Sequence, residues 1–210
     1  WGVSGDPDTG CIGFVSPDHE GQCKLAVDYM LDYIAEKDPS ATPKIMVMSQ
    51  GNAEKETKLI NASQKACDER GVEMQAVIVG TDSATQIEAI SNAYQANPDY
   101  NIWIGYTGEA PISCATVMNE AGTLDSTYIL GIDATKSHLD ALIDGRNVGI
   151  LEQGVYSCGY KCVYMAADYL INGELTQFNK EEYTQKTIVT EADIPVWQNI
   201  VNQVLAAMAK

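Results

Sequence analysis

The sequence predicts an α/β protein built on a doubly wound parallel sheet. Short apolar runs alternate with segments of helical periodicity along most of the 210 residues. Apolar runs of this length, bounded by turn residues and followed by a helix, are typical of buried parallel strands. The clearest one, Tyr128–Ile132, leads to a carboxylate at Asp133 and then to an amphipathic stretch. Ligands of such sheets bind beyond the carboxyl ends of the strands, so Asp133 is the first candidate for a ligand contact.

The expected elements follow one another with a period of roughly 25 to 30 residues, which favours parallel strands joined by helices. The strands are short apolar runs between turn residues: 11–15, 44–49, 72–79, 101–105, 128–132 and 148–152. The helices carry apolar residues at helical spacing: 20–37, 53–70, 83–97, 110–121 and 136–144. Prolines at 39 and 43 break the first helix, while Gly71 and Gly122 end the second and the fourth. Asp82 or Ser83 can cap the third, which runs to about Asn97.

After Gln153 the alternation changes. A long helix is expected at 156–172, an extended segment at 183–189 and a final helix at 194–208. Trp103 lies in the middle of a strand and Trp197 in the final helix, and both are expected to pack in a core.

Composition and charge disfavour several partners. The net charge is −16, with 13 Lys and Arg, so a polyanionic nucleic acid would be repelled. No basic amphipathic helix indicates binding to anionic lipid. No stretch approaches about 18 consecutive apolar residues, so no transmembrane helix is expected. Residues 1–10 lack the basic start and apolar segment of a signal peptide, so the protein is either cytosolic or begins after a segment that was removed.

The cysteines and histidines do not form an obvious metal site or catalytic site. Six cysteines are too few to suggest a disulfide framework, and Cys23 and Cys67 fall on apolar helix faces. Cys158 and Cys162 are four residues apart and could supply half a metal site, but no second pair completes the four ligands of structural zinc. No metal or other cofactor is expected. No nucleophile elbow, phosphate loop or acid–base pair is evident, so the chain is not expected to be an enzyme.

A set of landmarks along the whole chain is similar to one protein family. They are short turn and strand-end motifs: Ser16-Pro17-Asp18 with Gly21, Gly51-Asn52-Ala53-Glu54, Asn97-Pro98-Asp99, Glu120-Ala121-Gly122, Gly131-Ile132-Asp133, Asp144-Gly145, Gln153, Tyr156, Gly159-Tyr160 and Asn172-Gly173-Glu174. No single motif is specific, but the ordered set resembles the sugar-binding type I periplasmic binding proteins of ABC transporters, close to the ribose-binding group. The resemblance implies two α/β lobes joined by three crossovers, with a sugar between the lobes and closure about a hinge.

The resemblance also implies a division of the chain into one complete lobe and part of a second. Residues 1–15 would end the first lobe and form the first crossover, and 16–149 would form the second, C-terminal lobe. Residues 150–210 would hold the hinge, the C-terminal part of the first lobe and the last crossover. The opening half of the first lobe would then be missing. A truncated domain of this kind uncovers apolar surface, so self-association as a dimer is expected.

Family members act outside the cytoplasm, which implies a place in the periplasm or a lipid anchor on the outer face of the membrane. The resemblance therefore implies a lipoprotein or secreted protein whose signal peptide has been removed. It also implies that a sugar is passed to the membrane permease subunits of an ABC transporter.

Two residues match the ligand-binding positions of the family. Asp133 matches a strand-end aspartate that accepts hydrogen bonds from sugar hydroxyls, although it could instead cap the helix that starts near Thr135. Gln153 matches the glutamine at the hinge, with a surface amide as the alternative. Thr107 and Glu109 lie where the family usually has an Asn-Asp pair, and they could take its place.

Three further candidates lie in the first half of the chain. Asn52 belongs to the loop after the second strand. Lys58 is the nearest basic residue to a position where the family often has arginine, and it could equally be an exposed surface lysine. Thr81 stands where the family often has an aromatic residue. The loss of an arginine and of a stacking ring suggests a ligand other than plain ribose.

Other classes of protein share this fold. The main alternative is the effector-binding domain of a sugar-responsive transcription regulator, and another is the sensing domain of a chemotaxis or two-component receptor. The segment from Tyr183 to Trp197 is more similar to the transport receptors than to these.

Overall fold

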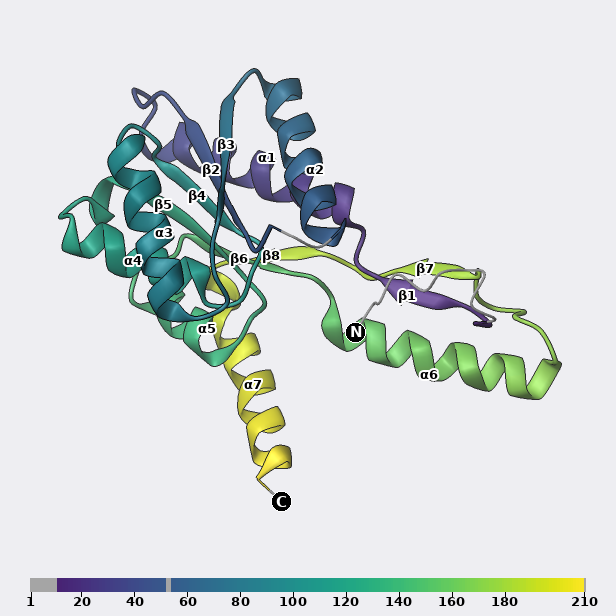
Figure 1. Cartoon of the computed structure of the whole chain (residues 1–210). Helices are drawn as coiled ribbons and strands as arrows, with labels where there is room; N and C mark the ends of the chain where they lie inside the picture. The colour runs from purple at the N-terminus through teal and green to yellow at the C-terminus, as the bar shows by residue number, and fades with distance from the viewer. Residues whose placement is uncertain (1–10, 52–53, 210) are drawn as a thin grey trace. The chain divides into compact units, whose positions relative to one another are not determined.

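The computed structural model describes residues 11–51 and 54–209, which form two compact units (Figure 1). The smaller unit holds the described residues up to Asp18 together with Glu152–Thr187. The larger unit holds His19–Leu151 and the chain from Ile188 onward. The polypeptide therefore passes from one unit to the other three times.

The larger unit is built on a six-stranded sheet with the strand order β3-β2-β4-β5-β6-β8. The strands are β2 Lys44–Ser49, β3 Glu73–Ile78, β4 Ile102–Gly105, β5 Tyr128–Ile132, β6 Gly149–Glu152 and β8 Thr187–Val189. The pairs β2–β3, β2–β4, β4–β5 and β5–β6 are all parallel. The order in which strands are added reverses at β2, because β3 pairs with one edge of β2 and β4 pairs with the other. The predicted doubly wound parallel sheet is confirmed.

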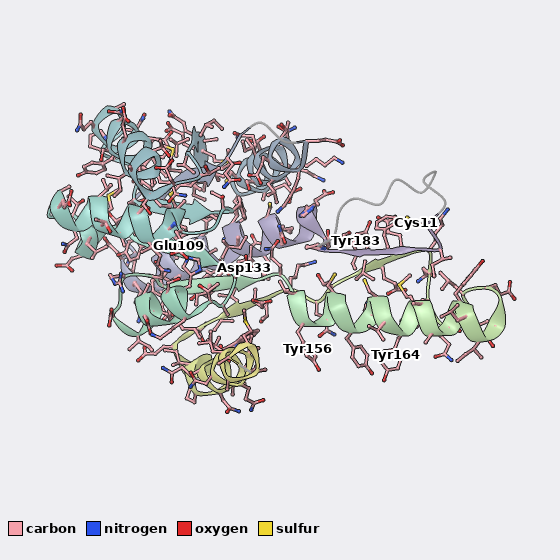
Figure 2. All side chains as sticks on the ribbon, turned by 60° about the horizontal axis from the view of Figure 1, so that its bottom comes forward. Cys11, Glu109, Asp133, Tyr156, Tyr164 and Tyr183 are labelled. Atoms are coloured by element: carbon pink, nitrogen blue, oxygen red, sulfur yellow. The ribbon has the colours of Figure 1, made fainter. Side chains whose placement is uncertain are left out.

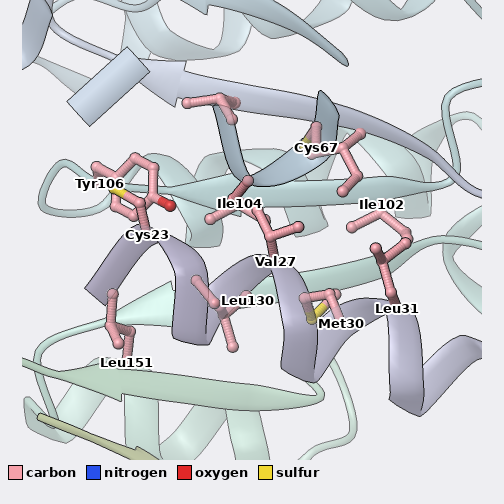
Figure 3. Close-up of a cluster of buried hydrophobic side chains, with 14 of the residues drawn as sticks. Cys23, Val27, Met30, Leu31, Cys67, Ile102, Ile104, Tyr106, Leu130 and Leu151 are labelled. Carbon is pink, nitrogen blue, oxygen red and sulfur yellow. The ribbon is translucent and has the colours of Figure 1, made fainter. Parts of the chain in front are cut away.

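Helices cover both faces of this sheet (Figure 1). They are α1 His19–Lys37, α2 Glu54–Arg70, α3 Ser83–Ala96, α4 Ala110–Glu120, α5 Lys136–Ile143 and α7 Ile194–Met208. On one face α1 and α2 pack in a single apolar cluster with the strands (Figure 3). On the other face α3 and α4 form a second cluster, and α5 and α7 form a third.

The strand side chains alternate between the two faces, as a pleated sheet requires. In β2, Ile45 and Val47 belong to the cluster under α1 and α2, whereas Met46 and Met48 belong to the cluster under α3 and α4. Because helices cover both faces of the sheet, β2 is a continuous apolar run and does not alternate between apolar and polar residues. Its bounds, like those of β5, are the predicted ones.

The expected packing positions are confirmed. Trp103 is fully buried, and its indole N–H donates to the Tyr100 carbonyl at 3.0 Å. Trp197 is partly buried against the α5–α7 cluster. Cys23 and Cys67 are fully buried in the cluster of α1 and α2.

The smaller unit consists of a two-stranded parallel sheet and one helix. Strand β1, Phe14–Ser16, pairs with β7, Glu181–Tyr183, and α6 runs from Val155 to Asn172. Glycines with positive φ stand at both ends of α6, Gly154 at 76° and Gly173 at 78°. None of the helices in the described part of the chain is both long enough and apolar enough to cross a membrane.

The structure differs from the sequence prediction at both segments of the smaller unit. Cys11, Ile12 and Gly13 are not in a strand, because β7 pairs only with residues 14–16. The extended segment expected at 183–189 is two short strands, β7 and β8, which belong to different sheets. Two 3₁₀ turns, at Leu124–Ser126 and Glu191–Asp193, were not predicted.

The end of the chain also groups differently from the expected division, which placed 150–210 together. In the structure, residues from Ile188 onward belong to the larger unit. The reason is packing, because Ile194 and Trp197 of α7 contact the cluster that includes Leu139 and Leu142 of α5. Which lobe of the family each unit represents stays a prediction.

Candidate functional site

The loops that follow β4 and β5 carry three of the predicted site residues. Thr107 and Glu109 come directly after β4, and Asp133 comes directly after β5. These strands are parallel neighbours, so their carboxyl ends meet at one edge of the sheet. Thr107 is buried, Asp133 is half-buried and Glu109 is exposed. Figure 2 shows Glu109 and Asp133 on these adjacent loops.

Hydroxyl groups at the start of α5 join the two loops. The Ser137 hydroxyl donates to Glu109 Oε1 at 3.0 Å, and Ser137 Oγ lies 3.0 Å from Thr135 Oγ1. A hydroxyl carries a single proton, so the Thr135 hydroxyl donates to Ser137 when Ser137 donates to the carboxylate. Sequence reasoning missed Ser137 because it considered strand ends only. The available signal was a small hydroxyl one helical turn beyond Asp133.

Asp133 has an unusual backbone conformation. Its φ is 57°, and it is the one non-glycine residue with positive φ in the described ranges 11–51 and 54–209. Its N–H donates to the Leu151 carbonyl at 2.9 Å, which continues the β5–β6 pairing. The cap of α5 is Thr135, whose side chain accepts from the His138 N–H. The alternative role for Asp133, as the cap of this helix, is therefore taken by Thr135.

A buried acid supports the neighbouring loop after β2. Glu56, in the first turn of α2, is 7% exposed and accepts a hydrogen bond from the Ser49 hydroxyl at 2.5 Å. The Gln50 N–H donates to the same carboxylate oxygen at 3.3 Å. Sequence reasoning missed this contact, because nothing in the pattern distinguishes Glu56 from the other acids of α2. Asn52 belongs to this loop but lies outside the described residues.

Lys58 and Thr81 lie away from the β4–β5 loops. Lys58 is exposed on α2 and forms an ion pair with Glu54 at 2.7 Å, one helical turn earlier. This agrees with the alternative of a surface lysine. Thr81 is exposed in the loop after β3, and β2 separates β3 from β4 in the sheet. The next residue, Asp82, caps α3 by accepting from the Thr85 N–H, as the sequence predicted.

Gln153 lies in the smaller unit, where it is 7% exposed. Its carbonyl accepts from the Thr184 hydroxyl at 2.5 Å. The preceding residue, Glu152, accepts from the N–H groups of Gly154 and Val155 and so satisfies the start of α6. The alternative of a surface amide for Gln153 is therefore wrong, because the residue is buried.

The cysteine pair on α6 is not arranged as a metal centre. Cys158 is half-buried and Cys162 is exposed. Burial raises the pKa of the Cys162 thiol, and the neighbouring Cys158 raises it further. Within residues 11–51 and 54–209, no three His, Cys, Asp or Glu side chains gather in a way that could hold a metal ion.

A cavity of about 340 Å³ lies at the opposite end of the strands. Tyr128 and Asn101, which mark the amino ends of β5 and β4, contribute to its lining, as do Asp38, Asp99 and Asp125. It is therefore separate from the loops that follow β4 and β5. Ligands of doubly wound sheets bind beyond the carboxyl ends, so the β4–β5 loops remain the candidate site.

A doubly wound sheet with polar side chains in its strand-end loops is the architecture of a protein that binds small molecules. Residues 3–175 match the family described as the periplasmic binding protein domain, and the chain belongs to this family. The prediction of this family from the sequence landmarks is confirmed.

Three solved structures are similar to the chain. A glucose-galactose binding protein from Geobacillus stearothermophilus is 21% identical, with a TM-score of 0.75 over 90% of this chain and 66% of its own. A periplasmic ribose ABC transporter protein from Conexibacter woesei is 17% identical, with a TM-score of 0.75 over 89% and 62%. An ABC transporter solute-binding protein from Agrobacterium vitis, with bound D-fucose, is 22% identical, with a TM-score of 0.71 over 89% and 63%. The chain thus spans slightly less than two thirds of the length of these proteins. No curated protein matches it.

Proposed function

We propose that this chain is part of the sugar-binding component of an ABC transporter. The observation that carries the proposal is the placement of Thr107, Glu109 and Asp133 in the loops after β4 and β5, with Ser137 at the start of α5 bonded to Glu109, in a periplasmic binding protein domain. The similar structures support it, because they are a glucose-galactose binding protein, a periplasmic ribose ABC transporter protein and a solute-binding protein with bound D-fucose.

The chemistry of this group suits a neutral polyhydroxyl ligand. Carboxylates such as Glu109 and Asp133 accept strong, charge-assisted hydrogen bonds from sugar hydroxyls. The hydroxyls of Thr107 and Ser137 can both donate and accept. Each can therefore donate to the oxygen of a sugar hydroxyl or accept its proton in a hydrogen bond. Two carboxylates on adjacent loops disfavour an anionic ligand. Lys58 is already paired with Glu54, which is consistent with a ligand other than a sugar acid or phosphate.

The proposal extends to mechanism and location. We infer that the ligand shifts an equilibrium between open and closed arrangements of the two units, with the hinge at the three places where the chain passes between them. Gln153 directly follows one of these passages, which supports its predicted role at the hinge. The family description supports a location outside the cytoplasm, where the sugar would be transferred to permease subunits.

Isothermal titration calorimetry with D-ribose, D-galactose, L-arabinose and D-fucose tests this function. We expect one of these sugars to bind, and we expect Asp133→Asn to weaken its binding strongly, to a Kd that is still measurable at high sugar concentration. Asp125→Asn is the matched control, because it makes the same chemical change at the opposite cavity and should leave the Kd unchanged. A Kd that is equal in wild type and Asp133→Asn would refute the assignment of the site.

A further inference from the structure

We propose that His138 is a positioning residue for Asp133. Its imidazole ring holds the Asp133 carbonyl and thereby the left-handed backbone conformation that aims the Asp133 side chain. The inference rests on the proposed function, because it takes Asp133 to be a ligand contact. It goes further in assigning a role to a buried histidine that the family landmarks do not include.

The conformation of Asp133 has to be held by its surroundings. A φ of 57° places the Cβ of an L-residue close to its own backbone, so this region is unfavourable for most residues other than glycine, and Asp is one of the few that adopt it as single residues. Such conformations persist where several neighbouring contacts fix them, and they are concentrated at functional sites. In this chain the unfavourable conformation occurs at the residue that sequence reasoning placed first among the candidate ligand contacts.

A closed set of hydrogen bonds fixes the segment. The Asp133 carbonyl accepts from the Thr135 N–H at 2.7 Å and from His138 Nδ1 at 2.9 Å. The Thr135 hydroxyl in turn accepts from the His138 N–H at 3.4 Å. Two donors hold the Asp133 carbonyl, and the hydrogen bond from the Asp133 N–H to the Leu151 carbonyl holds the other end of the residue, so the φ and ψ of Asp133 are confined between two fixed points.

The surroundings of the ring select one tautomer. A carbonyl oxygen only accepts, so Nδ1 must carry the proton of this hydrogen bond. The ring is 1% exposed, and Nε2 has no partner in the part of the chain that the structure describes. The hydrogen bond to the carbonyl therefore assigns the Nδ1–H tautomer to His138.

Gly131 lies against the Asn147 amide and within ordinary contact distance of the His138 ring. A Cβ at Gly131 would lie 2.9 Å from Asn147 Nδ2 and 3.6 Å from His138 Cδ2. Asn147 is 2% exposed, and its side-chain amide has no hydrogen-bond partner among the described residues. Buried polar side chains are normally hydrogen-bonded, and the bond from Nδ1 to the Asp133 carbonyl is the one that His138 makes with its ring.

Isosteric variants separate this role from simple filling of the core. His138→Asn can place an N–H donor near the position of Nδ1, His138→Gln can place one near Nε2, and His138→Ala has neither. We expect His138→Ala and His138→Gln to raise the Kd for the sugar that binds best in the panel above by about tenfold, comparable to releasing one strained residue. His138→Asn should retain an affinity close to that of wild type.

A double-mutant cycle tests whether His138 acts through Asp133. His138→Ala should change the Kd about tenfold in the wild-type chain and less than about twofold in the Asp133→Ala background. Ile90→Ala is the control for lost stability, because Ile90 is fully buried in the α3–α4 cluster, away from this segment. It should lower the melting temperature and leave the Kd unchanged. The same fold-change in both backgrounds, or equal Kd values for His138→Asn and His138→Gln, would overturn the inference.

Nuclear magnetic resonance decides the inference without a ligand. Long-range ¹H–¹⁵N spectra should show His138 as the Nδ1–H tautomer. In His138→Ala, the Cα and Cβ chemical shifts of Asp133 should move away from values typical of a left-handed backbone. In His138→Asn, they should keep these values. An Nε2–H tautomer, or Asp133 resonances unchanged in His138→Ala, would overturn it. Failure of every sugar to bind would defeat the proposed function, and these spectra would still decide the role of His138.

Discussion

Gly131→Ala is expected to destabilise the larger unit through one defined contact. The added Cβ would lie 2.9 Å from Asn147 Nδ2, about 0.5 Å short of the 3.4 Å at which ordinary contact begins. The backbone of Gly131 has no positive φ, so the substitution adds no dihedral strain and the effect is one of overpacking. Overpacking of a buried layer costs about 1–3 kcal/mol, and the lower end of this range applies because the atom that must move is the end of the Asn147 side chain. For a chain of this length, each kcal/mol lowers the Tm by about 2–4 °C.

Thermal denaturation followed by circular dichroism measures this effect against a control of the opposite sign. Gly159 lies within α6 and a Cβ there meets nothing within 4 Å, so Gly159→Ala should stabilise the helix by about 0.5–1 kcal/mol. Removing the obstructing amide with Asn147→Ala should make Gly131→Ala nearly neutral, with a coupling of about 1 kcal/mol or more. An unchanged Tm for Gly131→Ala, or a loss that Asn147→Ala does not relieve, would refute the reasoning.

Three other variants test the remaining parts of the structure. Hydrogen bonds, first from the Thr176 hydroxyl, lower the pKa of Asp168 from 3.8 to about 2, so its contribution to stability is present above pH 3.8 and is lost as the pH falls towards 2. Asp168→Asn should remove this loss of stability from an acid titration followed by circular dichroism. If the loss remains in the variant, another group causes it. Trp103→Ala should lower the free energy of unfolding in urea by about 3–5 kcal/mol, because the ring is fully buried; a loss below about 1 kcal/mol would contradict the packing. Leu170 and Ile171 are 83% and 80% exposed on α6, so Leu170→Lys with Ile171→Lys should shift sedimentation from dimer towards monomer, and an unchanged profile would exclude this face.

The elements that the sequence predicted most closely are those that its local pattern determines. β2, β5 and α7 begin and end at the expected residues, because each is an apolar or amphipathic run between clear turn or capping residues. The helix ends at Gly71 and Gly122 were predicted for a similar reason, since both glycines adopt positive φ.

The elements that differed depend on long-range partners. The segment 183–189 is extended, as expected, but its division into β7 and β8 follows from pairing with β1 in one sheet and β6 in the other. Alternation of side chains with a period of two residues indicates that a segment is extended, but it does not indicate which strand the segment pairs with. The same limit explains the site, because Asp133 was visible as a strand end, whereas the contact of Ser137 with Glu109 joins residues 28 positions apart.

The most direct test of the central claim is to map a bound sugar onto the chain by ¹H–¹⁵N correlation spectroscopy. Titration with the sugar that binds in calorimetry should shift the amide resonances of Thr107, Glu109, Asp133 and Ser137 in a saturable way. The resonance of Asp125, at the opposite cavity, should stay in place. Saturable shifts confined to that cavity, or no shifts in the loops after β4 and β5, would contradict the account.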